Sequence, residues 1–226
     1  MLNNILPAYK LPGMSTYDII RWFKKETGFK GKVGHGGTLD VFASGVVLLL
    51  LDQATKRFAD IQKLEKTYLA GVRLGVESTT LDVEGDFSRE AINKDLAVSD
   101  IKAGLEKFKG EFLQSVPAYS AAKHHGKPLY ELARKGIEVD KNKLVTIYSL
   151  DIVSFKSPLI TLKIGCSSGT YVRQLAYDIF NALGSASFLY FLERQKIGKI
   201  DKKMCAEVED LASNWKKHLF GVADLL

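Results

Sequence analysis

The sequence predicts an α+β fold built around one mixed, mainly antiparallel sheet that helices and loops flank. The apolar run Val46–Leu51 has the length of a buried strand. The stretch that begins at Tyr68 alternates with the period of two that strands have. Helical segments interrupt the strands irregularly, which favours a mixed sheet over the regular βαβ alternation of a parallel one.

The first helix is predicted between Ser15 and Gly28. Ser15 and Asp18 have the spacing of a capping box, and Gly28 supplies a stop signal. Its apolar face consists of Tyr17, Ile20 and Phe23. The five glycines between Gly31 and Gly45 then predict a loop that leads into the strand Val46–Leu51.

Three further helices are each expected to end at a glycine. Their apolar residues are Ile101, Leu105 and Phe108 before Gly110, then Leu129, Leu132 and Ala133 before Gly136, and finally Leu175, Ala176, Ile179, Phe180 and Leu183 before Gly184. Two strands, Leu144–Phe155 and Leu159–Cys166, are predicted on either side of a Ser157-Pro158 turn.

Length and composition place the chain among globular proteins. Its 226 residues are enough for one large domain, or one domain with an appendage. Hydrophobic residues (46%) and charged residues (26%) occur at values that exclude a disordered chain, a collagen-like repeat and a coiled coil. The longest apolar run is far shorter than the roughly twenty residues of a membrane span, and the N-terminus lacks the pattern of a signal peptide. We therefore expect a cytoplasmic protein.

The charge is unevenly distributed along the chain. The 32 Lys and Arg residues outnumber the 26 acidic ones, and the net charge of +6 favours a polyanionic partner. Two basic clusters stand out, and each is either a solvated surface or part of a groove for a phosphate backbone. One contains Lys123, His124, His125, Lys127, Arg134, Lys135, Lys141 and Lys143, and the other contains Arg194, Lys196, Lys199, Lys202 and Lys203.

The sequence favours neither a metal nor a cofactor. Cys166 and Cys205 are too few for a disulfide scaffold and are expected to be reduced thiols. His124 and His125 are adjacent, so they cannot share a helical face, and no pair with ligand spacing accompanies them. No glycine-rich phosphate loop of the nucleotide-binding kinds occurs.

The segment most suggestive of chemistry runs from Val33 to Asp40, with the sequence VGHGGTLD. Its glycines allow a tight backbone and the close approach of a large ligand. Two interpretations fit the residues alone. The segment is either a plain glycine-rich connector in which Asp40 caps a turn, or a functional loop that presents His35 and Asp40.

The segment is similar to the catalytic loop of the TruB-type pseudouridine synthases, and further blocks match that family in the same order. They cover the chain from about Lys10 to Arg194. The blocks are the opening with Lys10, Gly13, Met14 and Ser15, the strand Lys66-Thr67-Tyr68, the turn Gly75–Asp82, the segment from Gln114 to Lys123 with Gly126–Tyr130, and Cys166–Arg173. The resemblance implies a pseudouridine-synthase-like fold.

It also implies an RNA-modifying isomerase that acts on uridine 55 in the TψC loop of tRNA, without a cofactor. The resemblance implies that Asp40 is the nucleophile and that Arg173 is the cation that keeps the Asp40 carboxylate ionised. Tyr68 would stack on the flipped uracil, and its hydroxyl would move the C5 proton. His35 would either occupy the space that the base leaves or support the flipped neighbours. Tyr171 and Leu192 would line the base pocket, and Lys10 belongs to the substrate-binding residues.

The sequence departs from the family pattern at a few positions. Gly36 replaces a threonine, Val41 a proline and Glu193 an arginine. We expect residues 1–226 to form a single catalytic domain. About 195–226 would form a short C-terminal extension rather than a full RNA-binding domain, and a monomer is favoured. Two alternatives stay open: a tRNA-binding folding factor with weak or lost isomerase activity, and the catalytic subunit of a guide-RNA ribonucleoprotein.

Overall fold

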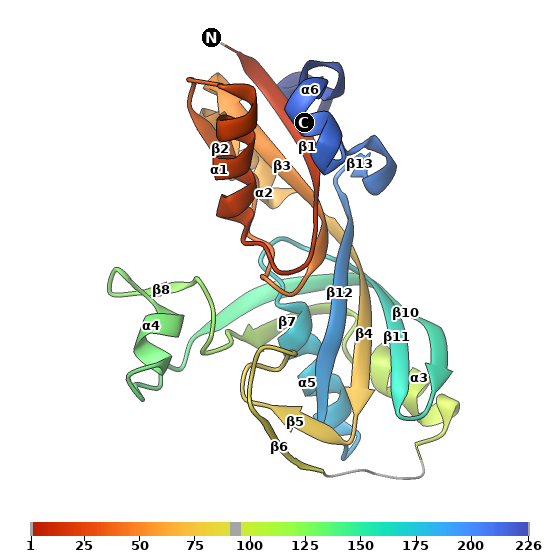
Figure 1. The fold of residues 1–226 in the computed structure, drawn as a ribbon. Coiled ribbons are helices and arrows are strands. Elements are labelled where there is room, and N and C mark those ends of the chain that lie inside the picture. The colour runs from red at the N-terminus through yellow and green to blue at the C-terminus, as the bar shows by residue number, and fades with distance from the viewer. Residues whose placement is uncertain (1, 91–95, 226) are drawn as a thin grey trace. The chain divides into compact units, whose positions relative to one another are not determined.

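The computed structural model describes residues 2–90 and 96–225, which divide into two compact units. Unit 1 comprises residues 1–69 and 192–226, and unit 2 comprises residues 70–191. Strands β4 (Lys66–Leu74) and β12 (Ser187–Ile197) each contribute residues to both units (Figure 1). Among the described residues, no helix is both long and apolar enough to cross a bilayer.

Unit 1 is built on a sheet with the strand order β14-β1-β3-β12, in which β2 also pairs with β3, and β13 with β12. β1 and β3 are antiparallel over eight residue pairs, whereas β3 and β12 are parallel. The elements of this unit are β1 (Asn3–Lys10), α1 (Thr16–Thr27), β2 (Val33–His35), β3 (Ser44–Asp52), η1 (Gln53–Arg57), α2 (Phe58–Lys63), β13 (Ile200–Asp201), η2 (Lys202–Met204), α6 (Val208–Ser213), η3 (Trp215–His218), β14 (Phe220–Gly221) and α7 (Val222–Leu225).

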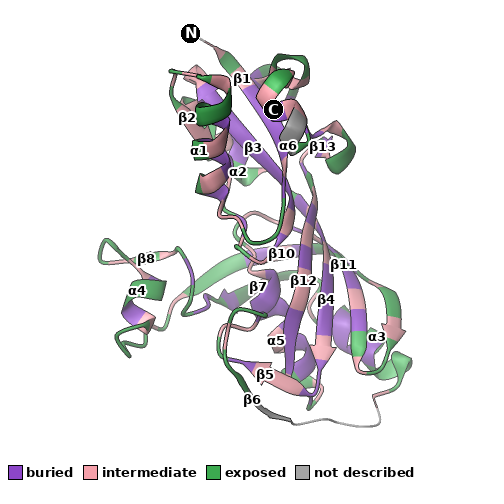
Figure 2. Ribbon diagram, viewed as in Figure 1, coloured by how far each residue is buried: buried purple, intermediate pink, exposed green. Residues whose placement is uncertain are grey.

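The core of unit 1 forms around β3, which is buried on both faces (Figure 2). This explains why its sequence is continuously apolar rather than alternating. One face packs with residues from α2, β12 and the C-terminal segment, among them Ile61, Ile197 and Val222. The C-terminal residues are thus part of the core, and β14 adds an edge strand beside β1.

Unit 2 contains the strand order β12-β4-β11-β10-β7, whose hydrogen-bonded pairs β10–β11 and β10–β7 are antiparallel. A segment of residues 116–141 leaves this sheet between β7 and β10, and we call it the arm. The elements of this unit are β5 (Val76–Ser78), β6 (Phe87–Glu90), α3 (Val98–Glu106), β7 (Gly110–Ser115), β8 (Lys123–His124), β9 (Lys127–Pro128), α4 (Leu129–Ala133), β10 (Asn142–Lys156), β11 (Leu159–Cys166) and α5 (Val172–Ala182).

The predicted α+β class and its mainly antiparallel sheet are confirmed, as are the helix after Ser15 with its capping box and the strands on both sides of Pro158. Three local predictions are wrong. Tyr17 does not belong to the buried face of α1, because it is 61% exposed. The glycine-rich segment is not all loop, because Val33–His35 pairs with β3. The helix that contains Ile101 ends at Glu106, so Phe108 lies beyond it.

Gly45 is a point where the sheet of unit 1 admits no side chain. It pairs with Lys10 on one side and Arg194 on the other, and its φ is +117°. A Cβ atom there would lie 2.6 Å from the backbone nitrogen of Arg194. The close approach of β12 to β3 therefore requires glycine at this position.

We expect Gly45→Ala to lower the free energy of unfolding by about 3 kcal/mol, because backbone strain and overpacking each cost ~1–3 kcal/mol. Gly13→Ala is the matched control, since Gly13 also has a positive φ (+84°) but a Cβ atom there would meet nothing within 4 Å. The control should lose only about 1 kcal/mol. Urea unfolding of both variants measures the difference, and equal losses would contradict the close-packing argument.

Candidate active site

The loop that carries Asp40 is held by the buried side chain of Arg194, which is 1% exposed. Its guanidinium donates from Nε to the carbonyl oxygen of Val46 at 2.7 Å, from Nη1 to that of Thr38 at 3.1 Å, and from Nη2 to that of Gly37 at 3.2 Å. The planar fork of an arginine is suited to fix several acceptors at once. Arg194 thus ties the start of the loop to β3.

Two further side chains hold the residues on either side of Asp40. Thr16 Oγ1 accepts from the backbone nitrogen of Leu39 at 3.0 Å and donates to its carbonyl oxygen at 3.3 Å. Lys10, which is 0% exposed, donates from Nζ to the carbonyl oxygens of Val41 (3.1 Å), Met14 (2.7 Å) and Leu11 (3.0 Å). The residues before and after Asp40 are therefore both fixed by buried polar groups.

Asp40 itself is half-buried, and its carbonyl oxygen accepts from the nitrogen of Ala43 at 3.2 Å. A carboxylate on so tightly tethered a loop is presented in a defined direction, which suits a nucleophile or a group that stabilises a developing positive charge. Among the described residues, no group of three or more His, Cys, Asp or Glu could hold a metal ion.

His35 lies at the end of β2, where it pairs with Leu49 of β3. Its Nδ1 is buried and has no hydrogen-bond partner within the described part of the chain. Burial, followed by the positive charge of Arg194, lowers the pKa of His35, and the backbone of Gly37 only partly opposes this. His35 is therefore held as the neutral imidazole near neutral pH.

Tyr68 and Leu192 are buried members of strands in unit 1. Tyr68 is 8% exposed and lies in β4, on the same face of the strand as the buried residue Ala70. Leu192 lies in β12 and is also buried. Both positions are compatible with a core role as well as with a wall of a base pocket. Their substrate contacts stay a prediction.

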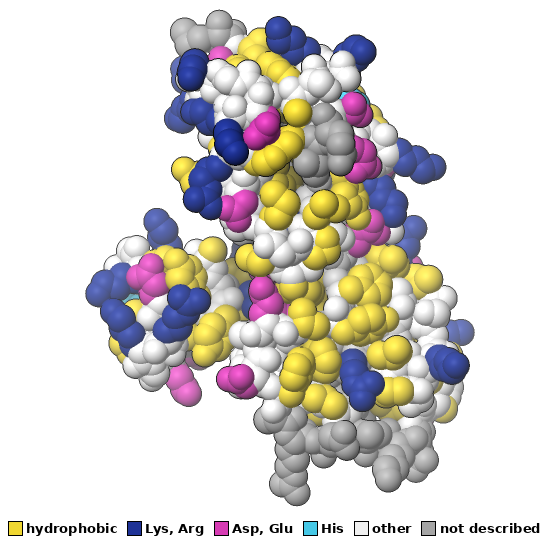
Figure 3. Space-filling model, viewed as in Figure 1, with side chains coloured by type: hydrophobic (Ala, Val, Ile, Leu, Met, Phe, Trp, Pro, Cys, Tyr) yellow, Lys and Arg dark blue, Asp and Glu magenta, His cyan; other side chains and the backbone are white. Residues whose placement is uncertain are grey.

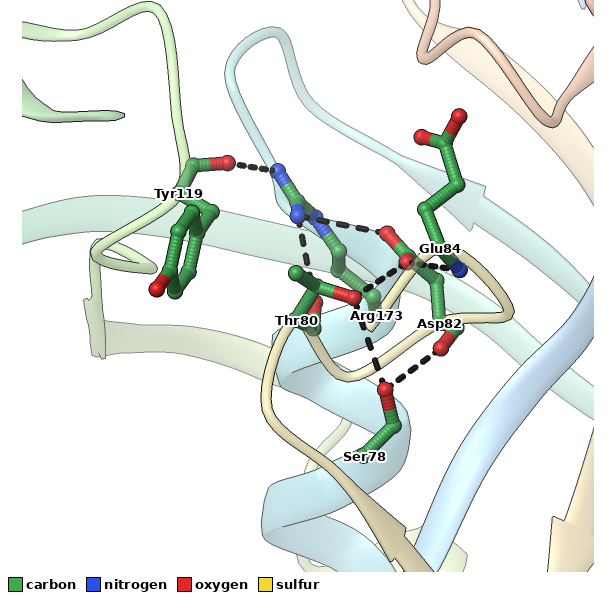
Figure 4. A network of polar contacts seen from close by, with 6 residues as sticks. All are labelled: Ser78, Thr80, Asp82, Glu84, Tyr119 and Arg173. Carbon is green, nitrogen blue, oxygen red and sulfur yellow. Dashed lines mark hydrogen bonds and ion pairs between the residues drawn. The ribbon is translucent and has the colours of Figure 1, made fainter. Parts of the chain in front are cut away.

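Arg173 lies in the first turn of α5, at 5% exposure, and is the centre of a polar network in unit 2 (Figure 4). Its Nη1 contacts Asp82 Oδ2 at 3.3 Å and donates to the carbonyl oxygen of Thr80 at 3.2 Å. Nη2 donates to the carbonyl oxygen of Tyr119 at 2.7 Å. Asp82 is fixed in turn, because its Oδ1 accepts from Thr80 Oγ1 at 2.5 Å and from the nitrogen of Glu84 at 3.0 Å.

Tyr171 precedes α5, as its N-cap residue, and is half-buried. It packs against a small cluster of Val116, Leu129 and Leu132, which belongs to the arm. The predicted site residues thus fall into two groups. Lys10, His35, Asp40, Tyr68 and Leu192 lie in unit 1, and Tyr171 and Arg173 lie in unit 2.

The structure also identifies residues that the sequence analysis did not place at a site. Arg194 was assigned to a basic cluster that is either a solvated surface or part of a groove for a phosphate backbone, and neither applies to Arg194 because its side chain is buried. Thr16 was part of a predicted helix only. Asp82 and Thr80 stood within a family block but carried no assigned role, and only the fold shows that they meet Arg173.

Glu193 partly offsets the positive charge of the second basic cluster. It accepts from Tyr9 Oη at 2.8 Å and from Lys202 Nζ at 3.0 Å. Burial raises the pKa of Glu193, but hydrogen bonds from Gln195, Tyr9 and Lys202 outweigh it and leave the pKa below its usual value. Glu193 is therefore ionised, and it offsets the charge of Lys202.

The first basic cluster lies on the arm except for Lys143, which belongs to β10, and most of its members are exposed. Lys127, Arg134 and Lys135 are all exposed, and Figure 3 shows Lys and Arg side chains gathered over the arm around α4. Arg134 also lies over the ring of Tyr130, 5.5 Å from its centroid. Exposed cations beside an exposed aromatic ring are a combination that suits RNA.

Comparison with known proteins gives consistent matches. The family model described as "TruB family pseudouridylate synthase (N terminal domain)" matches residues 24–172. A tRNA pseudouridine synthase B of Clostridium tetani is 37% identical over 211 residues, which cover 93% of this chain and 73% of that one. Its counterpart in Clostridium perfringens (strain 13 / Type A) is 36% identical over 228 residues, with coverage of 100% and 77%.

A chain in the crystal structure of a Cbf5-Nop10-Gar1 complex shares the fold, with a TM-score of 0.76 at 22% sequence identity. The superposition covers 97% of the present chain, which spans 60% of that longer one. The fold and the sequence matches together define the class as that of the pseudouridylate synthases. Within this class the chain belongs to the TruB family.

The lowered pKa of His35 gives a test of how its loop is packed. A group whose pKa is lower in the folded state than its ordinary value of 6.5 contributes stability above pH 6.5, and this stability is lost as the pH falls. We expect the unfolding free energy of the wild type, relative to His35→Gln, to fall by ~0.5–1 kcal/mol between pH 7.5 and pH 5.5.

Urea unfolding at three pH values measures this difference, and the remaining histidines cancel because both proteins contain them. A difference that does not change with pH would show that His35 titrates as it does in the unfolded chain.

Proposed function

We propose that this protein is a tRNA pseudouridine synthase that isomerises uridine 55 in the TψC loop, with Asp40 as the nucleophile. The observation that carries the proposal is the Asp40 loop, which matches the family block and is fixed on both sides by Lys10, Thr16 and Arg194. Relatives at 36–37% identity are named tRNA pseudouridine synthase B, and this supports tRNA as the substrate.

The proposed reaction is an isomerisation in which the atoms of the uridine are conserved. The bond between N1 and C1′ breaks, the uracil turns, and a bond between C5 and C1′ forms. The Tyr68 hydroxyl then moves the proton away from C5, and N1 gains a proton in exchange. No group is consumed, so the proposed reaction requires no cofactor.

Each remaining site residue has a proposed role in these steps. The base leaves its stack so that its ring can be reached. Tyr68 stacks on the flipped uracil, His35 fills the vacated space as a neutral ring, and Tyr171 and Leu192 line the pocket. Arg173 is the cation that keeps the carboxylate of Asp40 ionised. Lys10 contributes to RNA binding indirectly, by holding the Asp40 loop in place. Its Nζ donates to three carbonyl oxygens of the protein.

We further propose that residues 1–226 act as a single catalytic domain, as a monomer and in the cytoplasm. Such a protein needs neither a guide RNA nor a second subunit. The purified chain should therefore form pseudouridine in a tRNA transcript on its own. The position is tested by a transcript with cytidine at 55, which should gain no pseudouridine.

Asp40→Asn should abolish this activity while RNA binding survives. The amide is nearly isosteric but cannot act as the nucleophile, and turnover should fall by at least about a thousandfold. Asp60→Asn is the matched control, because Asp60 is a partly exposed carboxylate of α2 that pairs with Arg57. Pseudouridine mapping and filter binding measure the two effects. Turnover by Asp40→Asn at the control rate would exclude Asp40 as the nucleophile.

The arm should contribute to RNA affinity through its exposed charges. Lys127→Gln combined with Lys135→Gln should weaken tRNA binding and reduce the slope of log K against log salt by about 2, since each phosphate contact contributes about 1. Lys102→Gln with Lys107→Gln, both exposed and outside the arm, is a control of equal charge. Equal losses in the two double variants would show that only net charge matters.

A further inference from the structure

Gln114 is a buried residue of β7 whose side chain forms hydrogen bonds with the backbone of Tyr171, 57 positions away in the sequence. Its side chain is 1% exposed. Gln114 Nε2 donates to the carbonyl oxygen of Tyr171 at 3.1 Å, and Gln114 Oε1 accepts from the nitrogen of Tyr171 at 2.8 Å. The amide thus pairs with Tyr171 as a neighbouring strand would, using one donor and one acceptor.

The loop that ends at Tyr171 is held in the same manner at its other end. The nitrogen of Ser167 donates to the carbonyl oxygen of Thr146 at 2.8 Å, and Ser167 Oγ accepts from the nitrogen of Thr146 at 2.8 Å. Residues 167–171 are therefore fastened to β10 at the first residue and to β7 at the last. Gln114 is the side chain that fastens the last one.

This second attachment determines where α5 begins. The carbonyl oxygen of Tyr171 also accepts from the nitrogen of Leu175 at 3.0 Å, which is a hydrogen bond of the first turn. Arg173 lies within that turn, between the two bonded residues. The direction of the Tyr171 peptide therefore sets the direction in which the Arg173 side chain leaves the helix.

The ring of Tyr171 connects the same point to the arm. It packs against Val116, Leu129 and Leu132, and Val116 follows β7 two residues after Gln114. The buried amide of Gln114 thus holds Tyr171, which precedes α5 and packs against the apolar cluster of the arm.

We propose that Gln114 is a positioning residue for the isomerisation, which it serves by holding Tyr171 and Arg173 in their reactive positions. This inference rests on the proposed function, in which these two residues meet the substrate. A displacement of about 1 Å in such groups can cost roughly a hundredfold in rate. The loss should appear in kcat, whereas KM should change little because the charges of the arm remain.

Gln114→Glu is the sharpest variant, because it keeps the size of the side chain and makes one of the two bonds titratable. The ionised carboxylate can still accept from the Tyr171 nitrogen, but it cannot donate to the Tyr171 carbonyl oxygen. The protonated carboxyl can do both. Burial favours the protonated form, whereas Lys143, the cross-strand partner of Gln114, favours the ionised one.

The experiment compares kcat and KM of the wild type and Gln114→Glu between pH 5.5 and pH 8.5 on a tRNA transcript. We expect kcat of the variant to be roughly ten- to a hundredfold below the wild type at pH 8.5 and to recover toward it as the pH falls. Gln62→Glu, an exposed site in α2, adds the same charge and should follow the wild type at every pH. Gln114→Leu should be slow throughout, without recovery.

Circular dichroism at the assay temperature separates positioning from unfolding. A ratio of kcat values that stays constant with pH, a loss confined to KM, or a loss equal to the unfolded fraction would each overturn the proposal. An inactive wild type would instead refute the proposed function. In that case hydrogen exchange at the Tyr171 amide still decides the matter, because exchange unchanged between the wild type and Gln114→Leu would show that Gln114 holds nothing there.

Discussion

The buried guanidinium of Arg194 is the interaction on which the candidate site depends. A buried cation is costly unless its donors are satisfied, and here they are satisfied by peptide carbonyl oxygens rather than by a carboxylate. The positive charge therefore still acts on its surroundings, and it adds to burial, which is the larger cause, in lowering the pKa of His35. Removal of Arg194 would leave three carbonyl oxygens of the loop and of β3 without this donor. The presentation of Asp40 follows from the same contacts.

The packing around the loop explains one departure from the family pattern. A Cβ atom at Gly36 would lie 2.8 Å from Ile61 Cγ2 and 3.3 Å from Leu48 Cβ, both in the core of unit 1. A threonine has no room there without a shift of α2 or β3. The glycine is thus matched to its neighbours, and the nitrogen of Gly36 still donates to the carbonyl oxygen of Leu48 at 2.8 Å. The loop is therefore tightly packed at Gly36.

Much of the fold could be predicted because it depends on local patterns. The apolar run of β3 and the capping box at Ser15 are visible in the sequence, and both are present in the structure. The ordered blocks of family residues likewise led to the correct family. What could not be predicted depends on contacts across long separations. Arg194 looks like a surface residue beside four lysines, and only the parallel pairing of β12 with β3 carries it into the core. Gln114 has no sequence signal for its partner.

The two basic clusters differ in how far their charges are paired in the structure, although the sequence alone did not distinguish them. In the second cluster Arg194 is occupied by the loop, and Lys202 is paired with Glu193, which also binds Tyr9. The arm carries only a few acids, and besides its exposed lysines and arginine it contains the small apolar cluster against which Tyr171 packs. A polyanion that binds this arm therefore contacts the same segment that holds Tyr171 and, through the carbonyl oxygen of Tyr119, Arg173. Under the proposed function, the segment that binds RNA and the contacts that orient Tyr171 and Arg173 belong to one framework, in which the exposed charges serve affinity and the buried polar contacts serve turnover.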